Sequence, residues 1–160
     1  MFFTLLHSPK EIACELHEST LEDECIDELI ELSLQLFDIP PNRAYFSRLH
    51  EMQSPLVLIA RNMNGLIVGY KIGYALSKEV FYSWLGGIHP EYQHQGIASA
   101  MIIAQHAWCR QSNFTLIRTK THIQNLSMYI LNRNHGFHVV GFDESAIVGK
   151  RLLLSKNLFS

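Results

Sequence analysis

The sequence predicts a mixed α/β fold that forms a single domain over residues 1–160. Its 160 residues suffice for one hydrophobic core and leave little room for a second. Because 48% of the residues are hydrophobic and 18% charged, disordered and collagen-like chains are excluded. Three strand-like runs follow one another in the middle of the chain, and helical periodicity flanks them on both sides. This order differs from a regular alternation of strands and helices.

The first half of the chain predicts one strand, two helices and a hairpin. Residues 2–6 form a short apolar run, and apolar residues spaced by three and four over 22–38 predict an amphipathic helix. A shorter helix is predicted over 42–52. The apolar runs 56–60 and 66–75 are joined by Asn62-Met63-Asn64-Gly65, which is typical of a hairpin turn.

The second half predicts a further strand over 81–88, whose Gly86-Gly87 pair indicates a bulge or the close approach of a backbone or ligand. A helical stripe follows over 97–111, and then a strand over 114–121. A second helix begins at Asn125 and ends at Gly136. Two last strands are predicted, over 137–142 and 147–154.

The three cysteines, Cys14, Cys25 and Cys109, show none of the close spacings of zinc or redox motifs, so we expect reduced thiols. The nine histidines are scattered, and we expect no metal. The first residues lack the basic segment of a signal peptide, and no apolar run is long enough to span a membrane. We therefore expect a cytoplasmic protein without membrane partners.

Charge is divided unevenly along the chain. Residues 1–42 hold ten acids against Lys10, whereas residues 43–160 hold twelve Lys and Arg against five acids. The net charges of −9 and +7 predict a cationic ligand near the first part and an anionic ligand near the second. Solvated faces without a ligand are the alternative explanation.

The stretch from Trp84 to Ala98 joins a strand to a helix through a loop that ends in the small residues Gly96 and Ala98. Backbone N–H groups at a helix start are unpaired and the helix dipole is positive there, so this junction is suited to a pyrophosphate. The loop has neither the Gly-Lys-Ser/Thr of a nucleotide-hydrolase P-loop nor the glycine spacing of a Rossmann fold.

Gln93-His94-Gln95-Gly96-Ile97-Ala98 resembles the Gln/Arg-x-x-Gly-x-Gly/Ala loop of the GNAT superfamily of acyl-CoA-dependent N-acetyltransferases. The segment from Asn125 to Gly136-Phe137 is similar to a later helix of that family, and the order of elements also agrees. The resemblance implies a splayed, mostly antiparallel mixed sheet of about seven strands with about four helices. It also implies acetyl-CoA as co-substrate, bound where two strands diverge, and direct attack by an amine.

The same resemblance implies which residues bind the cofactor and which catalyse. Backbone groups of Gly86 and Ile88 are expected to pair with the pantetheine arm, and Asn125 to reach it. The pyrophosphate is expected on Gln93, His94, Gln95, Gly96, Ile97, Ala98 and Ser99.

Asn132 occupies the position of the tyrosine with which many relatives protonate the CoA thiolate, and an amide can only hydrogen-bond there. Tyr129 lies on the same helix stripe, and core packing is its alternative role. His122 ends the strand that faces the slot, and histidine exchanges protons near neutrality, although an inert surface histidine is the alternative. Lys120 stands where some relatives place a glutamate base.

Two classes of function follow from these residues. The first is N-acetylation of an amine acceptor, a small molecule or peptide that we expect to be cationic because acids gather in residues 20–55. The second is a non-catalytic acyl-CoA-binding or regulatory module, because Asn132 replaces the expected acid and no carboxylate base is evident. A pI near 6.5 argues against a nucleic-acid partner. The resemblance is also compatible with a homodimer.

Overall fold

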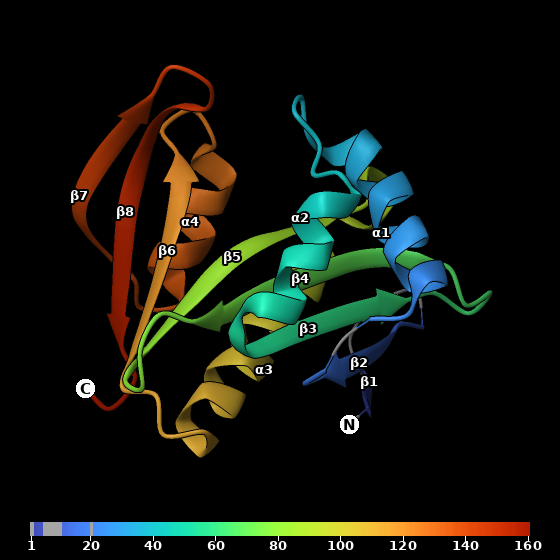
Figure 1. The fold of residues 1–160 in the computed structure, drawn as a ribbon, viewed down its shortest axis with the longest axis horizontal. Helices are drawn as coiled ribbons and strands as arrows, with labels where there is room; N and C mark the ends of the chain where they lie inside the picture. Colours follow the sequence, from blue (N-terminus) through green and yellow to red (C-terminus); the bar gives the residue numbers. More distant parts are fainter. Residues whose placement is uncertain (1, 5–10, 20) are drawn as a thin grey trace.

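The computed structural model describes residues 2–4, 11–19 and 21–160. In these ranges one eight-stranded sheet is covered by α-helices and two short 3-10 helices (Figure 1). The helices are α1 (Asp23–Leu36), α2 (Arg43–Ser47), η1 (Arg48–Glu51), η2 (Pro90–Tyr92), α3 (Ile97–Gln111) and α4 (Leu126–Asn134). The strands are β1 (Phe2–Thr4), β2 (Ala13–His17), β3 (Gln53–Arg61), β4 (Ile67–Ala75), β5 (Val80–Ile88), β6 (Leu116–His122), β7 (His138–Ser145) and β8 (Gly149–Asn157).

The sheet has the order β1-β2-β3-β4-β5-β6-β8-β7. Among the described strands, neighbours are antiparallel except β5 and β6, which run parallel and pair from Val80–Ser83 to Leu116–Thr119. Beyond these residues the two strands separate, and Figure 1 shows them diverging upward from a shared lower end. The sheet therefore consists of a first half-sheet, β1 to β5, and a second half-sheet, β6 to β8, joined at one short seam, as the predicted splayed sheet requires.

Three clusters of buried side chains hold the layers together. Helices α1 and α2 cover one face of the first half-sheet, where Leu29 and Phe46 pack with Tyr70. Helix α3 covers the opposite face, where Met101 packs with Leu58. The third cluster extends from Phe81 of β5 through Ile117 of β6 to Phe137 after α4, so it supports the seam between the half-sheets.

The structure adds one strand to the predicted set and moves one bulge. Strand β2 was not predicted, although Cys14 and Leu16 alternate with Glu15 and His17 as in a short half-buried strand. The predicted first strand is seen over Phe2–Thr4, and residues 5 and 6 lie outside the described residues. The bulge in β5 is at Trp84, because Ser83 pairs with Gly73 and Leu85 with Ile72. A bulge at Gly86-Gly87 is therefore wrong, whereas the alternative of a close backbone approach is correct for Gly86.

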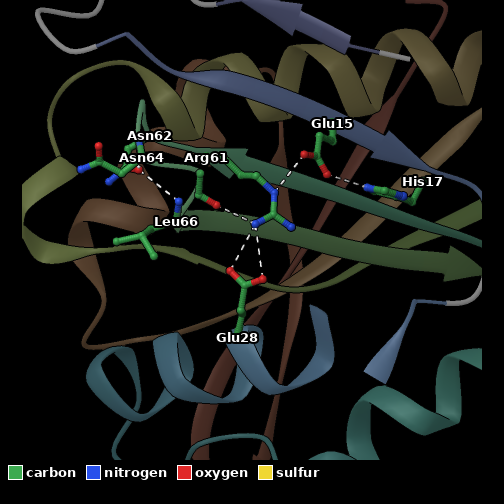
Figure 2. A network of polar contacts seen from close by, with 8 residues as sticks. Glu15, His17, Glu28, Arg61, Asn62, Asn64 and Leu66 are labelled. Atoms are coloured by element: carbon green, nitrogen blue, oxygen red, sulfur yellow. Dashed lines mark hydrogen bonds and ion pairs between the residues drawn. The ribbon is translucent and has the colours of Figure 1, made fainter. Parts of the chain in front are cut away.

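Arg61 joins three elements at the end of β3 (Figure 2). Its Nε donates to Glu15 of β2 at 2.9 Å, and one terminal nitrogen donates to Glu28 of α1 at 3.2 Å. The same nitrogen donates to the carbonyl oxygen of Gly65 in the β3–β4 turn at 2.8 Å. Only 23% of the Arg61 side chain is exposed, so these contacts are partly shielded from solvent.

We expect Arg61→Met to lower the free energy of unfolding by about 2 kcal/mol, because two carboxylates and a carbonyl lose their half-buried donor. Arg43→Met is the matched control, since Arg43 pairs with Asp23 and Asp27 on the exposed side of α1. Its cost should stay below about 0.5 kcal/mol. Urea unfolding of both variants measures the difference, and equal costs would contradict a structural role for Arg61.

Candidate functional site

The gap between β5 and β6 begins where Trp84 leaves the parallel pairing. Strand β5 is paired with β4 from Phe81 to Ile88 on both sides of the bulge at Trp84, but from Trp84 to Ile88 it has no partner on the β6 side. Backbone N–H and C=O groups on that side therefore face the gap without a strand partner. An extended molecule with amide groups can pair with such an edge in the manner of an added strand.

Gly86 lies against β4 with no space for a side chain. A β-carbon at this position would lie 2.7 Å from the Tyr70 carbonyl oxygen and 3.2 Å from the Cα of Lys71, the residue directly opposite. Lys71 also pairs with Leu58 of β3, whose side chain packs under α3, so both side chains are on the α3 face. Burial lowers the pKa of Lys71 to about 8. Lys71 was not among the residues predicted from the sequence, although a single cation within the apolar run 66–75 could have indicated it.

The loop after β5 is held open by its own side chains. Gln93 Nε2 donates to the Ile88 carbonyl oxygen at 3.0 Å, and Gln95 Nε2 donates to the Glu91 carbonyl oxygen at 3.1 Å. His94 and Gly96 have positive φ angles of 60° and 85°. A β-carbon at Gly96 would meet no heavy atom within 4 Å, so this position faces open space.

Helix α3 begins directly behind that open space. Gly96 is its N-cap, the Ile97 side chain is buried in the core, and Ala98 is small and half-buried. The first N–H groups of the helix have no acceptor within the helix, and the helix dipole makes this end positive. The loop and helix start therefore have the form that the predicted pyrophosphate site requires.

Helix α4 places Asn132 against β6, whereas Asn125 caps the helix and Tyr129 packs into the core. Asn132 is 4% exposed, and its Nδ2 donates to the Thr121 hydroxyl at 3.2 Å. The Asn125 side chain accepts from the Met128 N–H at 3.1 Å and so caps the helix. Tyr129 packs against the third core cluster, which favours its alternative role in packing.

His122 is exposed at the end of β6. It follows Thr121, whose side chain contacts α4, so His122 lies on the opposite face of the sheet. Lys120 shares that face with His122, and its Nζ pairs with Asp143 of β7 at 2.7 Å. The Asp143 carboxylate is therefore already paired with a cation.

A chain of basic groups links α3, α4 and β8. The Ser99 hydroxyl lies 2.7 Å from His135 Nε2, and Lys156 Nζ donates to the His135 carbonyl oxygen at 2.7 Å. Lys156 Nζ also lies 3.0 Å from His106 Nδ1. Burial, followed by the charge of Lys156, lowers the pKa of His106 to about 3, so His106 is neutral at pH 7.

His106, His135 and Lys156 border a cavity of ≈ 590 Å³. Arg110 and Lys156 contribute its positive charge, and no Asp or Glu is found among its described lining residues. None of the residues predicted to bind the cofactor lines it, but His135 connects it to Ser99 at the start of α3. The cavity therefore adds positive charge behind a loop that carries no Lys or Arg.

The model of the acetyltransferase (GNAT) family matches residues 20–149. The chain belongs to this family. The gap beside β5, the glycine-containing loop and the start of α3 are thus parts of a GNAT acetyltransferase fold, as the resemblance of residues 93–98 and 125–137 predicted.

Solved GNAT structures share this fold at low sequence identity. Ard1 from Thermoplasma volcanium has a TM-score of 0.81 and 15% identity over 92% of this chain and 99% of its own. The ribosomal-protein-S18-alanine N-acetyltransferase from Escherichia coli has a TM-score of 0.75 and 14% identity over 91% and 94%. A GNAT acetyltransferase from Elizabethkingia anophelis with acetyl-CoA bound has a TM-score of 0.72 and 15% identity over 91% and 97%.

No curated protein sequence matches this GNAT chain. Within the described residues, no helix combines the length and apolar character needed to cross a membrane. The three cysteines are free, with Cys14 and Cys109 buried and Cys25 half-buried, as expected for packed thiols.

Proposed function

We propose that the chain transfers the acetyl group of acetyl-CoA to a primary amine of a cationic small molecule or peptide. The observation that carries this proposal is the gap beside β5, which begins at Trp84 and leads to the start of α3 behind Gly96. Its first part offers backbone groups and its last part offers helix N–H groups. Acetyl-CoA combines an amide-containing arm with a pyrophosphate in that order.

The residues along this path would hold the co-substrate in a fixed direction. Gly86 and Ile88 offer backbone groups to the pantetheine arm, and the segment from Gln93 to Ser99 receives the pyrophosphate. Asn125 keeps its amide nitrogen for the arm while its oxygen caps α4. Arg110 and Lys156 add long-range attraction for the anionic end.

Acetyl-CoA supplies an acetyl group activated as a thioester. The amine nitrogen bonds to the acetyl carbon, the carbon–sulfur bond breaks, one ammonium proton reaches the sulfur and a second reaches solvent. Asn132 has a second N–H besides the one that Thr121 accepts, and it can donate this to the departing sulfur. Lys71 on one face of the sheet and His122 on the other can accept the solvent-bound proton.

The test is CoA release from acetyl-CoA in the presence of a panel of amines, with CoA binding followed separately by calorimetry. Release that depends on a cationic amine supports the proposal. CoA binding without amine-dependent release would instead support the non-catalytic acyl-CoA-binding module, which the burial of Asn132 in place of an acid favours.

Asn132→Ala is expected to lower kcat about ten-fold, because the departing sulfur loses a hydrogen-bond donor. The KM for acetyl-CoA should change by less than about two-fold, since the arm and pyrophosphate contacts remain. Ser127→Ala, at an exposed position of the same helix, is the matched control. A loss confined to KM would assign Asn132 to binding alone.

A further inference from the structure

Four aromatic side chains meet at the mouth of the gap, on the face of the sheet that carries α1 and α2. The Tyr45 ring of α2 stacks on Trp84 of β5 with centroids 5.5 Å apart and an interplanar angle of 13°. Tyr74 of β4 presents its ring at a steep angle to Trp84 at 5.7 Å and to Tyr82 of β5 at 5.6 Å. Tyr45, Tyr74, Tyr82 and Trp84 are called the aromatic wall below.

The aromatic wall is accessible, and its hydroxyl groups have no hydrogen-bond partner among the residues that the structure describes. Tyr45 is 43% exposed and the other three side chains are half-buried. None of the three tyrosine hydroxyls is hydrogen-bonded to another residue in the described ranges. Burial raises the pKa of Tyr74, and that of Tyr82 to about 12, so both phenols stay neutral and keep oxygen lone pairs for a donor.

The position of the aromatic wall places it beside the reacting end of the gap. Trp84 is the bulged residue at which β5 leaves β6, two residues before Gly86. The loop that leads to α3 takes the opposite end and the opposite face. A second substrate must approach from the face that this loop leaves free, and there it meets Tyr82 and Trp84.

Three of the five acids of α1 are already paired with arginines and so are less available to a cation at this mouth. Asp23 and Asp27 pair with Arg43, and Glu28 pairs with Arg61. Within the seam, Tyr82 pairs with Arg118 of β6, and it lies near Arg151 and Asp143, which pair with each other. The protein's own Arg48 contacts the aromatic wall, because its guanidinium lies 6.0 Å from the Tyr45 ring centroid.

We propose that the aromatic wall is the acceptor subsite and that it binds the ammonium group of a cationic amine through ring faces and phenol oxygens. This inference rests on the proposed function. Because cation–π contact stabilises the charged form, the rings hold the amine as an ammonium, and its proton leaves to a separate acceptor before attack on the thioester. The aromatic wall thus selects the acceptor by its charge, and the proton that the amine loses leaves to solvent.

The experiment uses two unreactive probes of the same shape, choline and its neutral analogue 3,3-dimethyl-1-butanol. Binding is followed through the fluorescence of Trp84 in the full chain carrying Trp108→Phe, which removes the other tryptophan on the α3 face. We expect saturable binding of choline and at least ten-fold weaker binding of the alcohol. Equal affinity for both would overturn the inference, because an apolar surface alone does not distinguish them.

Variants of Tyr45 separate the contribution of its aromatic ring to choline affinity from the contribution of its apolar bulk. Tyr45→Phe should keep choline affinity within about two-fold, whereas Tyr45→Leu should weaken it about five-fold or more. Glu31→Gln, at an exposed position of α1, is the control and should leave choline affinity unchanged. Affinity that follows Glu31 and not Tyr45 would assign recognition to the acids. Because these measurements need no turnover, an absence of CoA release in the panel assay would refute the proposed function and leave choline binding measurable.

Discussion

Gly96→Ala is expected to weaken CoA binding about ten-fold or more while lowering the free energy of unfolding by only about 1 kcal/mol. Gly96 has a φ of 85°, where an L-residue is strained, and its missing side chain faces the open space at the start of α3. The added methyl group would occupy the place that the pyrophosphate must enter to reach the helix N–H groups.

Gly65→Ala provides a matched control for the Gly96 variant. Gly65 has a φ of 80°, and a β-carbon added there would also meet no heavy atom within 4 Å, but Gly65 lies in the β3–β4 turn. Both variants should lose similar stability in urea unfolding, and calorimetry should show normal CoA binding for Gly65→Ala. Normal binding by Gly96→Ala would remove the loop from the cofactor site.

The burial of His106 is expected to lower the stability of the folded chain at acid pH. Its pKa falls from the ordinary 6.5 to about 3 in the folded chain, first because it is buried and then because Lys156 lies against it. Between pH 6.5 and pH 3 the unfolded chain binds a proton that the folded chain does not. Stability is therefore complete above pH 6.5 and declines as the pH falls, by at most about 1.4 kcal/mol per pH unit from this group.

His106→Gln removes this titration and should flatten the decline, by about 2 kcal/mol between pH 6.5 and pH 5. Glutamine keeps an oxygen that can accept from Lys156 Nζ. His50→Gln, at an exposed position of η1, should retain the wild-type slope. Urea unfolding at a series of pH values measures the slopes, and parallel curves for wild type and His106→Gln would disprove the role of His106.

Local patterns in the sequence were sufficient to predict most of the fold. The turn at Asn62 to Gly65 forms as expected, with the Gly65 N–H donating to the Asn62 carbonyl oxygen at 2.9 Å. Helix α4 begins at an Asn cap and ends before Gly136, whose φ is 90°. These signals depend on residues close together in the sequence, and so they can be recognised without a partner strand.

The bulge at Trp84 shows why parts of the site escaped prediction. A regular alternation along β5 would place Gly86 on the same face as Trp84, but the extra residue moves Leu85 to the α1 face and Gly86 to the α3 face. The register with β4 determines which face each residue takes, and this register cannot be derived from the sequence of β5 alone. Lys71 was missed for the same reason, since its position opposite Gly86 depends on the pairing of two strands.

The aromatic wall depends on contacts that are still more distant in the sequence. Tyr45 and Trp84 come from different elements and stack only because α2 packs across the first half-sheet. The acids of residues 1–42 are a stronger signal by composition, yet four of them pair with Arg43 and Arg61. Composition records which charges exist, whereas the fold decides which of them remain available to a ligand.

The short seam between β5 and β6 has a consequence for the cooperativity of unfolding. The two half-sheets are coupled by the pairing of Val80–Ser83 with Leu116–Thr119 and by the side chains packed around Phe81. A molecule that pairs with the rest of β5 acts as the absent strand and extends the coupling along the sheet. Ligand binding should therefore change the protein from two weakly coupled halves into one cooperative unit, with slower amide exchange on both sides of the seam.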